Sequence, residues 1–558
     1  MLSLATRIGR SLRDFTRARG GNVAITFAFA TLPVVAFIGA AVDYSHANSV
    51  KAALQAALDS TALMVAKDAP NVSSTELNAK AHGYFTALFT RPEATVINIS
   101  AAYSATGGSN VLVTGSVSVP TKFMGVLGVN TMTVEGSSTS KWGSTRLRVA
   151  LVLDTTGSMA SAGKLTALKS ATASLLDQLK AAASINGDVY VSIIPFSRGV
   201  NVGSQNYTAS WIDWSEWEAE PAYMATWLSN SSNLTTWEQT GPGDDCPLSN
   251  SKTGFTCTRG PSNDASNTST IPSSGSYSGY ICPGVDSGTK DSTKAGFYYN
   301  GCYNSVPSTR VISSGSSASC GTAVNCSCSG SGSSSKCSQS YYSHTWLKNA
   351  RSTWTGCVAD RGSINAPGTS AGNDQTATAP NPSDVTTRYP ARNDIYCGSE
   401  VSGLNYDWST MKSTVSGLVA NGGTNQPIGL VMGWHSLVGI GPFTMPAKQT
   451  GYEYTEVIIL LSDGLNTWDR WYGNGSATNT SVDYRMYDSS GNGTCKNIKA
   501  ANITIYTIQV NTDGDPTSTL LKNCASSPEK FYLLTSASGI ATVFSQIGTN
   551  LTQLRVAK

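Results

Sequence analysis

The chain has 558 residues, and its 38 Lys and Arg nearly balance its 35 Asp and Glu, giving a net charge of +3. Charged residues make up 13% of the sequence, about half of the usual share of roughly 25%. The near-neutral charge gives no sign of a nucleic-acid-binding surface, and 12 Trp and 23 Tyr without a Gly-X-Y or heptad repeat exclude collagen, a coiled coil and wholesale disorder. This composition favours an exported, loop-rich protein over a cytosolic enzyme.

The N-terminus predicts a membrane anchor. Residues 1–21 contain five arginines and one acid, and Val23–Val42 follows as twenty residues without a charge. As a helix this segment spans about 30 Å, the thickness of the hydrocarbon core of a bilayer, and the arginines favour a cytoplasmic N-terminus. The alternatives are a cleaved signal peptide, whose apolar region is usually only about 7–15 residues long, and a buried soluble helix. We therefore expect the chain after Asp43 to be exported.

The apolar pattern continues beyond the predicted span. Five residues recur at intervals of three or four, as on one face of a helix: Val50, Leu54, Leu58, Ala62 and Val65. Pro70 disfavours continuation, so we expect one long helix that packs on the domain following it. That domain, up to residue 145, shows a short amphipathic helix around 76–90 and three alternating strand patterns, which predict a small α+β module.

From Arg146 the chain alternates between buried strands and helices. The strand RLRVALVLD is followed by a helix over 164–183 and by the strand DVYVSIIPFS. The alternation resumes after residue 400, with expected helices at 411–419, 428–437, 495–501, 519–524 and 540–554, and expected strands at 456–464, 503–510 and 530–535. Repeated strand–helix units with apolar strands predict an α/β fold with a doubly wound parallel sheet.

A long insertion, residues 202–400, separates the two halves of this pattern. It is rich in Ser, Gly, Asn, Thr, Cys, Tyr and Trp and shows almost no helical or strand periodicity. Such a long irregular segment requires a function or cross-links. The tryptophans at 211, 214 and 217 favour packing, although an exposed set would suit contact with a protein or a glycan.

The cysteines predict the cross-links. Ten of the 12 lie between Cys246 and Cys397, and an even set in an exported segment indicates disulfides whose pairing the sequence leaves open. Cys495 and Cys524 flank a helix–strand unit away from this cluster, and we expect them to pair with each other. A zinc site is the weaker alternative, because the cluster lacks a CxxC pair.

Polar side chains lie at three places where strands end or helices begin. Asp154, Thr156 and Ser158 follow the first strand of the α/β pattern, Thr424 follows a Gly-Gly turn, and Asp463 ends the strand EVIILLSDG. The carboxyl ends of parallel strands meet at one edge of a sheet, where ligands bind. Carboxylates and hydroxyls are hard oxygen donors that suit Mg²⁺, Ca²⁺ or Mn²⁺. The alternative is a helix-capping turn that binds no cation.

These residues resemble the metal-ion-dependent adhesion site (MIDAS) of von Willebrand factor A (vWA) domains. The D-x-S-x-S loop of that family matches Asp154, Thr156 and Ser158, with threonine replacing the first serine. The separate threonine of the family matches Thr424, and its aspartate at the end of the fourth strand matches Asp463. The resemblance implies a cation held directly by the three hydroxyls, with the two aspartates mainly orienting waters and balancing charge.

The N-terminal segment from RGGNVAITFAFATLPVVAF to DSTAL looks like the TadE/TadG-like region of Flp (Tad) pilus-assembly proteins. The C-terminal segment from KNIKAANITIYTIQVN to IATVFSQIG also looks like TadG proteins, which join such an anchor to an A-type domain. Pilin-like relatives carry Glu five residues after a processing glycine. Here Gly20 and Gly21 are followed at that distance by Ile25 and Thr26, so we expect a permanent anchor.

The resemblance implies a single-pass protein of the bacterial inner membrane, with a cytoplasmic N-terminus and a C-terminal domain that is periplasmic or surface-exposed. We expect it to recognise a protein partner of the pilus or secretion machinery, and to bind no nucleic acid. The expected organisation is a basic tail (1–21), an anchor helix (22–69), a small module (70–145), the first half of a vWA domain (146–201), the insertion (202–400) and the second half of the vWA domain (401–558).

Enzymatic motifs are missing from the sequence. Asp154-Thr-Thr lacks the second acid of a phosphoryl-transfer loop, Gly157-Ser158-Met159 is no nucleophile elbow, and no Walker lysine pattern occurs. We therefore expect no catalytic function. Two other functions stay open: a surface adhesin that binds host protein or glycan through the insertion, and a structural scaffold of the cell envelope.

Overall fold

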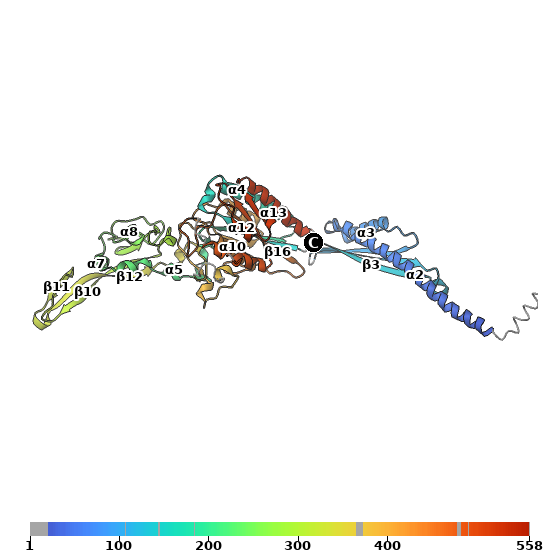
Figure 1. Ribbon diagram of the computed structural model, residues 1–558, viewed down its shortest axis with the longest axis horizontal. Coiled ribbons are helices and arrows are strands. Elements are labelled where there is room, and N and C mark those ends of the chain that lie inside the picture. Colours follow the sequence, from blue (N-terminus) through green and yellow to red (C-terminus); the bar gives the residue numbers. More distant parts are fainter. Residues whose placement is uncertain are drawn as a thin grey trace, which may run out of the picture. The chain divides into compact units, whose positions relative to one another are not determined.

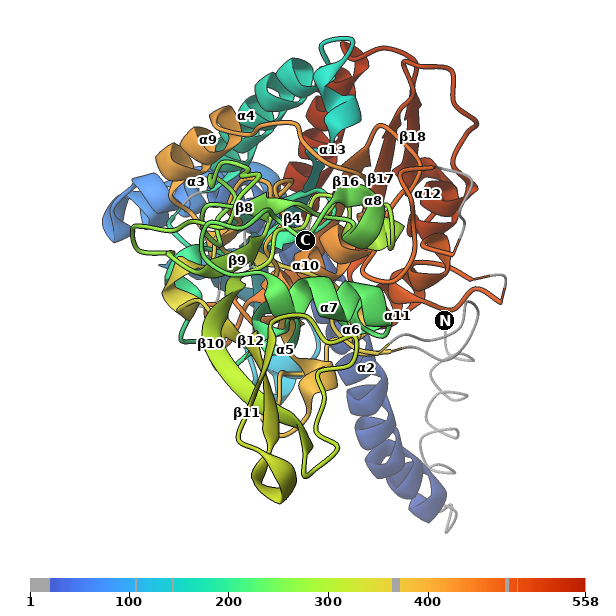
Figure 2. The same cartoon turned by 90° about the vertical axis from the view of Figure 1, so that its left-hand side faces the viewer.

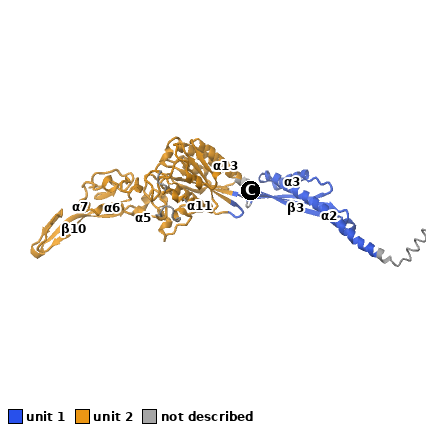
Figure 3. Cartoon of the chain, viewed as in Figure 1, with its two compact units in different colours: residues 1–145, 449–453, 555–558 blue, residues 146–448, 454–554 orange. Residues whose placement is uncertain are grey.

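A computed structural model describes residues 21–105, 108–142, 145–183, 185–363, 372–476, 481–488 and 490–556. The expected basic tail lies outside the described residues, apart from Gly21. The chain divides into two compact units (Figure 3). The first contains residues up to Thr145 with Gln449–Glu453 and Arg555–Lys558, and the second contains Arg146–Lys448 and Tyr454–Leu554.

The first unit is built on helix α2 (Gly21–Ala66), a single helix of 46 residues that contains Pro33. It is followed by the short turn η1 (Ala69–Asn71) and by α3 (Ser74–Leu88), whose first turn is capped by the Ser73 side chain accepting from the N–H of Glu76. An antiparallel sheet then forms in the order β1-β2-β3, from β1 (Thr95–Ser104), β2 (Ser109–Pro120) and β3 (Thr131–Trp142).

The core of this unit lies between the C-terminal half of α2 and its own sheet. All five residues of the predicted apolar stripe are buried there, against Val111, Val113 and Val117 of β2. The N-terminal half of α2 carries exposed apolar side chains and continues past the sheet (Figure 1). Among the described residues, α2 is the one helix that is long and apolar enough to cross a membrane.

The second unit contains a six-stranded sheet in the order β15-β5-β4-β16-β17-β18. The pairs β4–β5, β16–β17 and β17–β18 are parallel, whereas the edge strand β15 runs antiparallel to β5. The sheet is therefore mixed at one edge, where the sequence predicted a wholly parallel one. The strands are β4 (Thr145–Asp154), β5 (Val189–Phe196), β15 (Ser402–Asn405), β16 (Glu453–Ser462), β17 (Thr504–Val510) and β18 (Phe531–Leu534).

Helices cover both faces of this sheet, as the doubly wound prediction requires (Figure 2). One core cluster packs α4 (Lys164–Ala182), α9 (Trp408–Ser416) and α13 (Gly539–Val556) on the sheet. The other packs α10 (Gln426–Val438), α11 (Thr494–Ala500) and α12 (Thr519–Cys524) on the opposite face. This arrangement confirms the predicted α/β fold class, with helices on both faces of the sheet.

The insertion has more regular structure than its sequence suggested. It contains a five-stranded sheet in the order β11-β12-β10-β9-β8, with a long antiparallel hairpin of β10 (Gly301–Ser314) and β12 (Lys336–Lys348). The sequence showed almost no strand periodicity in this segment, so these strands were not predicted. Most positions in the outer parts of β10 and β12 are solvent-accessible, so neither strand shows the apolar–polar alternation of a half-buried strand.

The remaining elements of the insertion are short. Its helices are α5 (Ser215–Glu218), α6 (Tyr223–Leu228), α7 (Ser231–Gln239) and α8 (Asn250–Thr253). Its other strands are β7 (Ile212–Asp213), β8 (Cys257–Thr258), β9 (Tyr280–Pro283), β11 (Cys326–Ser329), β13 (Cys357–Val358) and β14 (Tyr389–Pro390). The strand β6 (Val200–Asn201) lies just before the insertion and pairs with β13.

Disulfides hold the insertion together. Five link its cysteines, and a sixth joins α11 to α12 through Cys495 and Cys524. The five pairs are Cys246–Cys257, Cys282–Cys302, Cys320–Cys326, Cys328–Cys337 and Cys357–Cys397. The insertion also begins and ends at one place, because Asn201 pairs with Glu400 and its carbonyl accepts from the N–H of Val401 at 2.9 Å.

The three neighbouring tryptophans of the insertion pack internally. Trp214 and Trp217 are buried with their rings edge to face, 5.1 Å between centroids, and Trp211 packs edge to face on Tyr389. They do not form an exposed platform.

Candidate metal centre

The predicted oxygen donors meet at the carboxyl end of β4. Asp154 ends this strand and is fully buried. Its carboxylate accepts hydrogen bonds from the N–H of Thr156 at 2.8 Å and from the hydroxyl of Ser462, the last residue of β16, at 2.5 Å. Burial and the nearby charge of Asp463 raise the pKa of Asp154 to about 7. The strand ends thus bring two carboxylates together in a site with little water, where a bound cation would be favourable.

A chain of hydrogen bonds connects the hydroxyls to the second carboxylate. The Thr156 and Ser158 hydroxyl oxygens lie 3.1 Å apart. The Ser158 hydroxyl donates to Oδ1 of Asp463 at 2.8 Å. These residues come from the loop after β4 and the loop after β16, so the order of strands in the sheet is what places them side by side.

The loop that carries Thr424 is joined to this cluster by its backbone. The N–H of Gly157 donates to the carbonyl of Gly422 at 2.8 Å, and the N–H of Asn421 donates to the carbonyl of Thr155 at 2.8 Å. Thr424 itself lines a pocket with Ser158. The structure therefore brings all five residues to one corner of the sheet.

Two residues that the sequence analysis did not select hold Thr424 in place. Its N–H donates to the Thr467 hydroxyl at 2.8 Å, and its carbonyl accepts from the N–H groups of Thr467 and Trp468. Both follow Asp463 in the loop after β16. The sequence could have indicated these two residues, because they follow a strand of a parallel sheet at the same edge as Asp154.

The glycine pair before Thr424 is required by what packs on it. Gly422 has φ +77°, and a Cβ there would lie 2.7 Å from the Tyr396 Cβ. A Cβ on Gly423 would lie 1.8 Å from the ring of Trp468. Only glycine lets Tyr396 of the insertion and Trp468 approach the loop this closely.

A buried lysine also belongs to the cluster. Nζ of Lys164, at the start of α4, lies 2.6 Å from Oδ2 of Asp463 and 2.7 Å from Oδ2 of Asp513. Burial of the ammonium opposes its charge, but the hydrogen bonds and charges of the two aspartates prevail, so the pKa of Lys164 is raised. The lysine offsets part of the negative charge of the site.

A pocket of about 430 Å³ adjoins the oxygen cluster. Its lining includes Ser158 and Thr424 from the sheet edge, Tyr396 from the insertion, and Arg198 and Trp468. The insertion therefore contributes to the walls above the site. The sequence alone did not predict these walls, because the insertion is so long. The pocket leaves space for a group of another molecule beside the hydroxyls.

Arg198 connects the insertion to this pocket. Its guanidinium stacks on the Trp468 ring, 4.1 Å from the centroid, and lies 3.6 Å from Oδ2 of Asp394. It also donates to the carbonyls of Thr293, at 2.8 Å, and Ala295. The guanidinium is thus held in the wall of the pocket, where its positive charge favours binding of an anionic group.

The donor set fits a hard divalent cation. Hydroxyl and carboxylate oxygens are the ligands that Mg²⁺ and Ca²⁺ prefer, and here Thr156, Ser158 and Asp463 are already in mutual contact beside a pocket. The residues that would hold it directly are Thr156, Ser158 and Thr424. Asp463 accepts from the Ser158 hydroxyl, and Asp154 accepts from the N–H of Thr156, so the two carboxylates would balance its charge. A zinc–thiolate site elsewhere in the chain is not supported. The sulfurs of Cys320, Cys326 and Cys328 lie close to one another, but all three are in disulfides.

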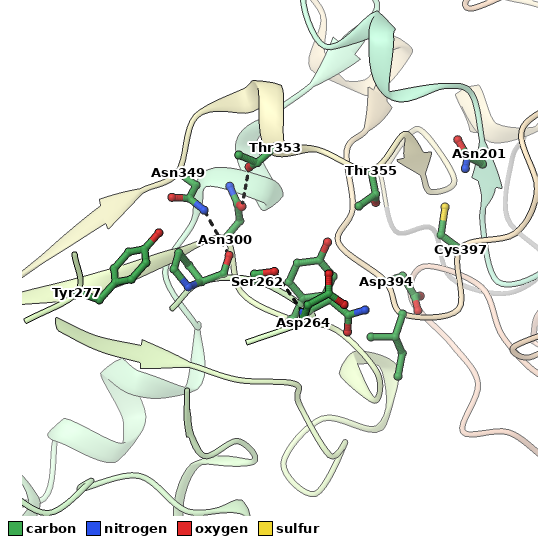
Figure 4. A pocket seen from close by; sticks show the side chains of 14 residues that line it. Asn201, Ser262, Asp264, Tyr277, Asn300, Asn349, Thr353, Thr355, Asp394 and Cys397 are labelled. Carbon is green, nitrogen blue, oxygen red and sulfur yellow. Dashed lines mark hydrogen bonds between the residues drawn. The ribbon is translucent and has the colours of Figure 1, made fainter. Parts of the chain in front are cut away.

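A second pocket, of about 540 Å³, lies in the insertion and is lined mainly by amides, hydroxyls and tyrosines (Figure 4). Asn300 is buried, and its Nδ2 has no hydrogen-bond partner among the described residues. The Asn349 amide donates to the carbonyl of Pro261 at 3.3 Å, and Tyr277 and Tyr298 add aromatic surface. The carboxylates of Asp264 and Asp394 also line the pocket, which therefore offers hydrogen-bond donors and acceptors beside aromatic rings.

The N-terminal region of the chain is similar to a known protein family. Residues 21–68 match a family described as putative Flp pilus-assembly TadE/G-like. Among curated proteins none matches the chain. The apolar helix and the disulfides agree with a membrane-anchored or exported protein.

The solved structures that are similar to this chain include several pilus proteins. The vWF domain of the type V pili tip protein Mfa5 from Porphyromonas gingivalis is 9% identical, with 73% of this chain and 95% of that chain covered and a TM-score of 0.29. A mutant of the PilB minor pilin from Streptococcus sanguinis is 9% identical, with 84% and 81% covered and a TM-score of 0.29. The pilus adhesin SpaC from Lactobacillus rhamnosus GG is 11% identical, with a TM-score of 0.29. The match covers 83% of this chain but only 35% of SpaC.

Proposed function

We propose that this protein is a membrane-anchored, exported component of Tad pilus assembly whose vWA domain binds Mg²⁺, or a similar hard cation, and recognises a protein partner. The contact between the Ser158 hydroxyl and Asp463, at the edge of an open pocket, is the observation that carries this proposal. In this reading α2 is a single-pass anchor of the inner membrane, with a cytoplasmic N-terminus, and the second unit works in the periplasm or at the cell surface.

The partner would supply an acidic side chain. The proposed cation would be held by Thr156, Ser158 and Thr424, with Asp154 and Asp463 balancing charge, and an open side of its shell would face the pocket. Arg198 in the pocket wall adds a second positive group for the same carboxylate. Positive groups in the wall of a pocket favour an anion over a neutral group. We propose no catalytic role for the chain.

Thermal unfolding with and without Mg²⁺ tests the cation site. We expect Mg²⁺ to raise the melting temperature of the wild type, by an amount that corresponds to about 2.7 kcal/mol at a hundredfold excess over the dissociation constant, and a chelator to reverse it. Ser158→Ala should lose most of this response. Ser161→Ala is the matched control, because its hydroxyl lies in the same turn and donates only to the carbonyl of Ser158, at 2.9 Å.

The same variants test the biological role. In cells we expect Ser158→Ala and Asp154→Ala to be exported at normal levels but to reduce pilus formation, while Ser161→Ala leaves it unchanged. Equal melting temperatures of the wild type in chelator and in Mg²⁺, together with normal pili in Asp154→Ala, would show that the loop is only a capping turn.

The second candidate function is a surface adhesin that binds glycans through the insertion. The observation in its favour is the polar pocket with the buried Asn300, whose Nδ2 has no hydrogen-bond partner among the described residues. Whole cells carrying Tyr277→Ala or Asn349→Ala would lose binding to a glycan array and keep their pili, if this function holds. Loss of pili after replacing residues 203–398 with a short linker, without any glycan binding by the wild type, would favour the assembly role alone.

A further inference from the structure

The turn between β2 and β3 of the first unit is unusually apolar for an exported loop. It contains the short turn η2 (Met124–Leu127). Val126 is 87% exposed, Leu127 62% and Phe123 47%, and Val129 is also exposed. Turns in water are normally built from Gly, Asn, Asp, Ser and Pro. A cluster of exposed apolar side chains on one turn indicates a surface that something apolar covers.

The turn is fixed to a specific level of α2. The carboxylate of Asp43 accepts hydrogen bonds from the N–H groups of Lys122, Phe123 and Met124, at 2.8, 2.8 and 2.7 Å. One helical turn earlier, a Cβ on Gly39 would lie 2.5 Å from the Cβ of Phe123, so the turn rests directly on the helix backbone there. Gly39 lies near the end of the uncharged segment Val23–Val42, and Asp43 follows this segment directly.

The backbone of the turn needs little water. The N–H of Val126 donates to Phe123, that of Gly128 to Gly125 and that of Val129 to Met124, each at 3.1 Å. With the three N–H groups bound by Asp43, most donors between Lys122 and Val129 have protein partners. Internal hydrogen bonding of the backbone is the condition for entering an apolar medium.

The helix on which the turn rests also carries exposed apolar side chains. On α2, the side chains before Gly39 are exposed and apolar, among them Val34, Val35, Phe37 and Ile38. Lys122 is exposed at the base of the turn, where an ammonium group suits lipid phosphates.

We propose that Phe123–Val129 inserts into the membrane from the side of the exported domain and forms a second lipid contact beside the anchor helix. This inference rests on the membrane anchor of the proposed function. Together, Asp43, Gly39 and the inserted turn would set the height and rotation of the first unit at the bilayer, which a lone helix leaves free.

Site-specific quenching in lipid nanodiscs tests the proposal on the full chain. All twelve native cysteines are in disulfides, so a single added cysteine can be labelled with an environment-sensitive dye. Three variants are compared: Val126→Cys in the turn, Phe37→Cys in the span, and Leu63→Cys. Leu63 is the control, since it is 70% exposed and apolar but lies about 36 Å further along α2 than Gly39.

We expect lipids with a doxyl group near the headgroup to quench the dye at Val126 at least threefold more than the dye at Leu63. Equal quenching at Val126 and Leu63, with strong quenching at Phe37, would overturn the turn's insertion and leave the anchor intact. Weak quenching at all three would instead remove the anchor itself. A dye at Val126 that is shielded from water but not quenched by the lipids would mean that a protein covers the turn, and would also overturn the proposal.

Discussion

Nζ of Lys164 lies 2.6 Å from Oδ2 of Asp463, and neither side chain has surface exposed to solvent. The pair ties the first helix of the second unit to the strand end that carries the proposed cation ligand. A buried ion pair is sensitive to loss of one partner, because the other charge then has no compensation.

Lys164→Met should therefore destabilise the second unit by about 3–5 kcal/mol in chelator. Mg²⁺ should restore part of this loss, so that the variant gains more from the cation than the wild type does. Lys169→Met is the control, since Lys169 donates only to the carbonyl of Ser416 and its hydrogen bond is exposed; a change of at most about 0.5 kcal/mol is expected there. Thermal unfolding at several Mg²⁺ concentrations measures both. Equal cation responses in wild type and Lys164→Met would contradict the coupling.

Acid should loosen the attachment of the insertion to α10. His435 is fully buried, where Nδ1 accepts from the Tyr389 hydroxyl and Nε2 lies 2.8 Å from the Thr376 carbonyl. Burial and the Arg361 charge lower the pKa of His435 to about 3. Between pH 6.5 and 3 the unfolded chain binds this proton and the folded chain does not, so stability falls as the pH falls.

The expected loss from His435 is about 2 kcal/mol between pH 7.5 and pH 5. His435→Gln should reduce the pH dependence of the free energy of unfolding by this amount. The comparison with the variant is needed because burial raises the pKa of Asp374 to about 6, which acts in the opposite direction. Urea unfolding at the two pH values measures the difference, and identical pH dependences would refute the role of His435.

Close packing of α10 on β4 should make Gly433 intolerant of a side chain. A Cβ at this position would lie 2.5 Å from Cγ2 of Val152 in the core. Gly433→Ala should cost about 1–3 kcal/mol through overpacking, despite the better helix propensity of alanine. Gly83→Ala in α3 is the matched control, because nothing lies within 4 Å of its added Cβ, and it should stabilise by roughly 0.5–1 kcal/mol. Thermal unfolding of the two units reports each effect.

The disulfide between Cys495 and Cys524 should stabilise the second unit strongly. The pair is separated by 29 residues, and closing such a loop contributes roughly 3–4 kcal/mol in the chain-entropy model. Replacing both by serine should lower the free energy of unfolding by this amount. The same replacement at Cys320 and Cys326, only 6 residues apart, should cost roughly 2 kcal/mol or less and leave the six-stranded sheet intact. Peptide mapping that finds a free thiol at Cys495 would contradict the prediction.

The sequence was sufficient for the regular part of the fold because its signals are periodic. The apolar stripe from Val50 to Val65 and the strand ending at Asp154 lie where their patterns placed them. The hairpin of β10 and β12 has no such signal, since much of it faces solvent on both sides. At the candidate site, Asp154 and Asp463 lie at strand ends and were found. Arg198 also follows a strand of the sheet, β5, but was not selected, and Tyr396 reaches the pocket from the insertion through contacts that no local pattern encodes.

The meeting of Asn201 and Glu400 at the base of the insertion has a consequence for biogenesis. During synthesis β4, α4 and β5 are the first elements of the second unit to be made, and β5 pairs in the finished sheet with β15, about 200 residues later in the chain. Until β15 and β16 have been made, the apolar strands β4 and β5 lack their partners. The ten cysteines of the insertion must form their disulfides during the same interval. Contacts of such high sequence separation form slowly and leave apolar strands open to aggregation. Production of this chain therefore depends on the thiol-oxidation and chaperone capacity of the compartment that receives it.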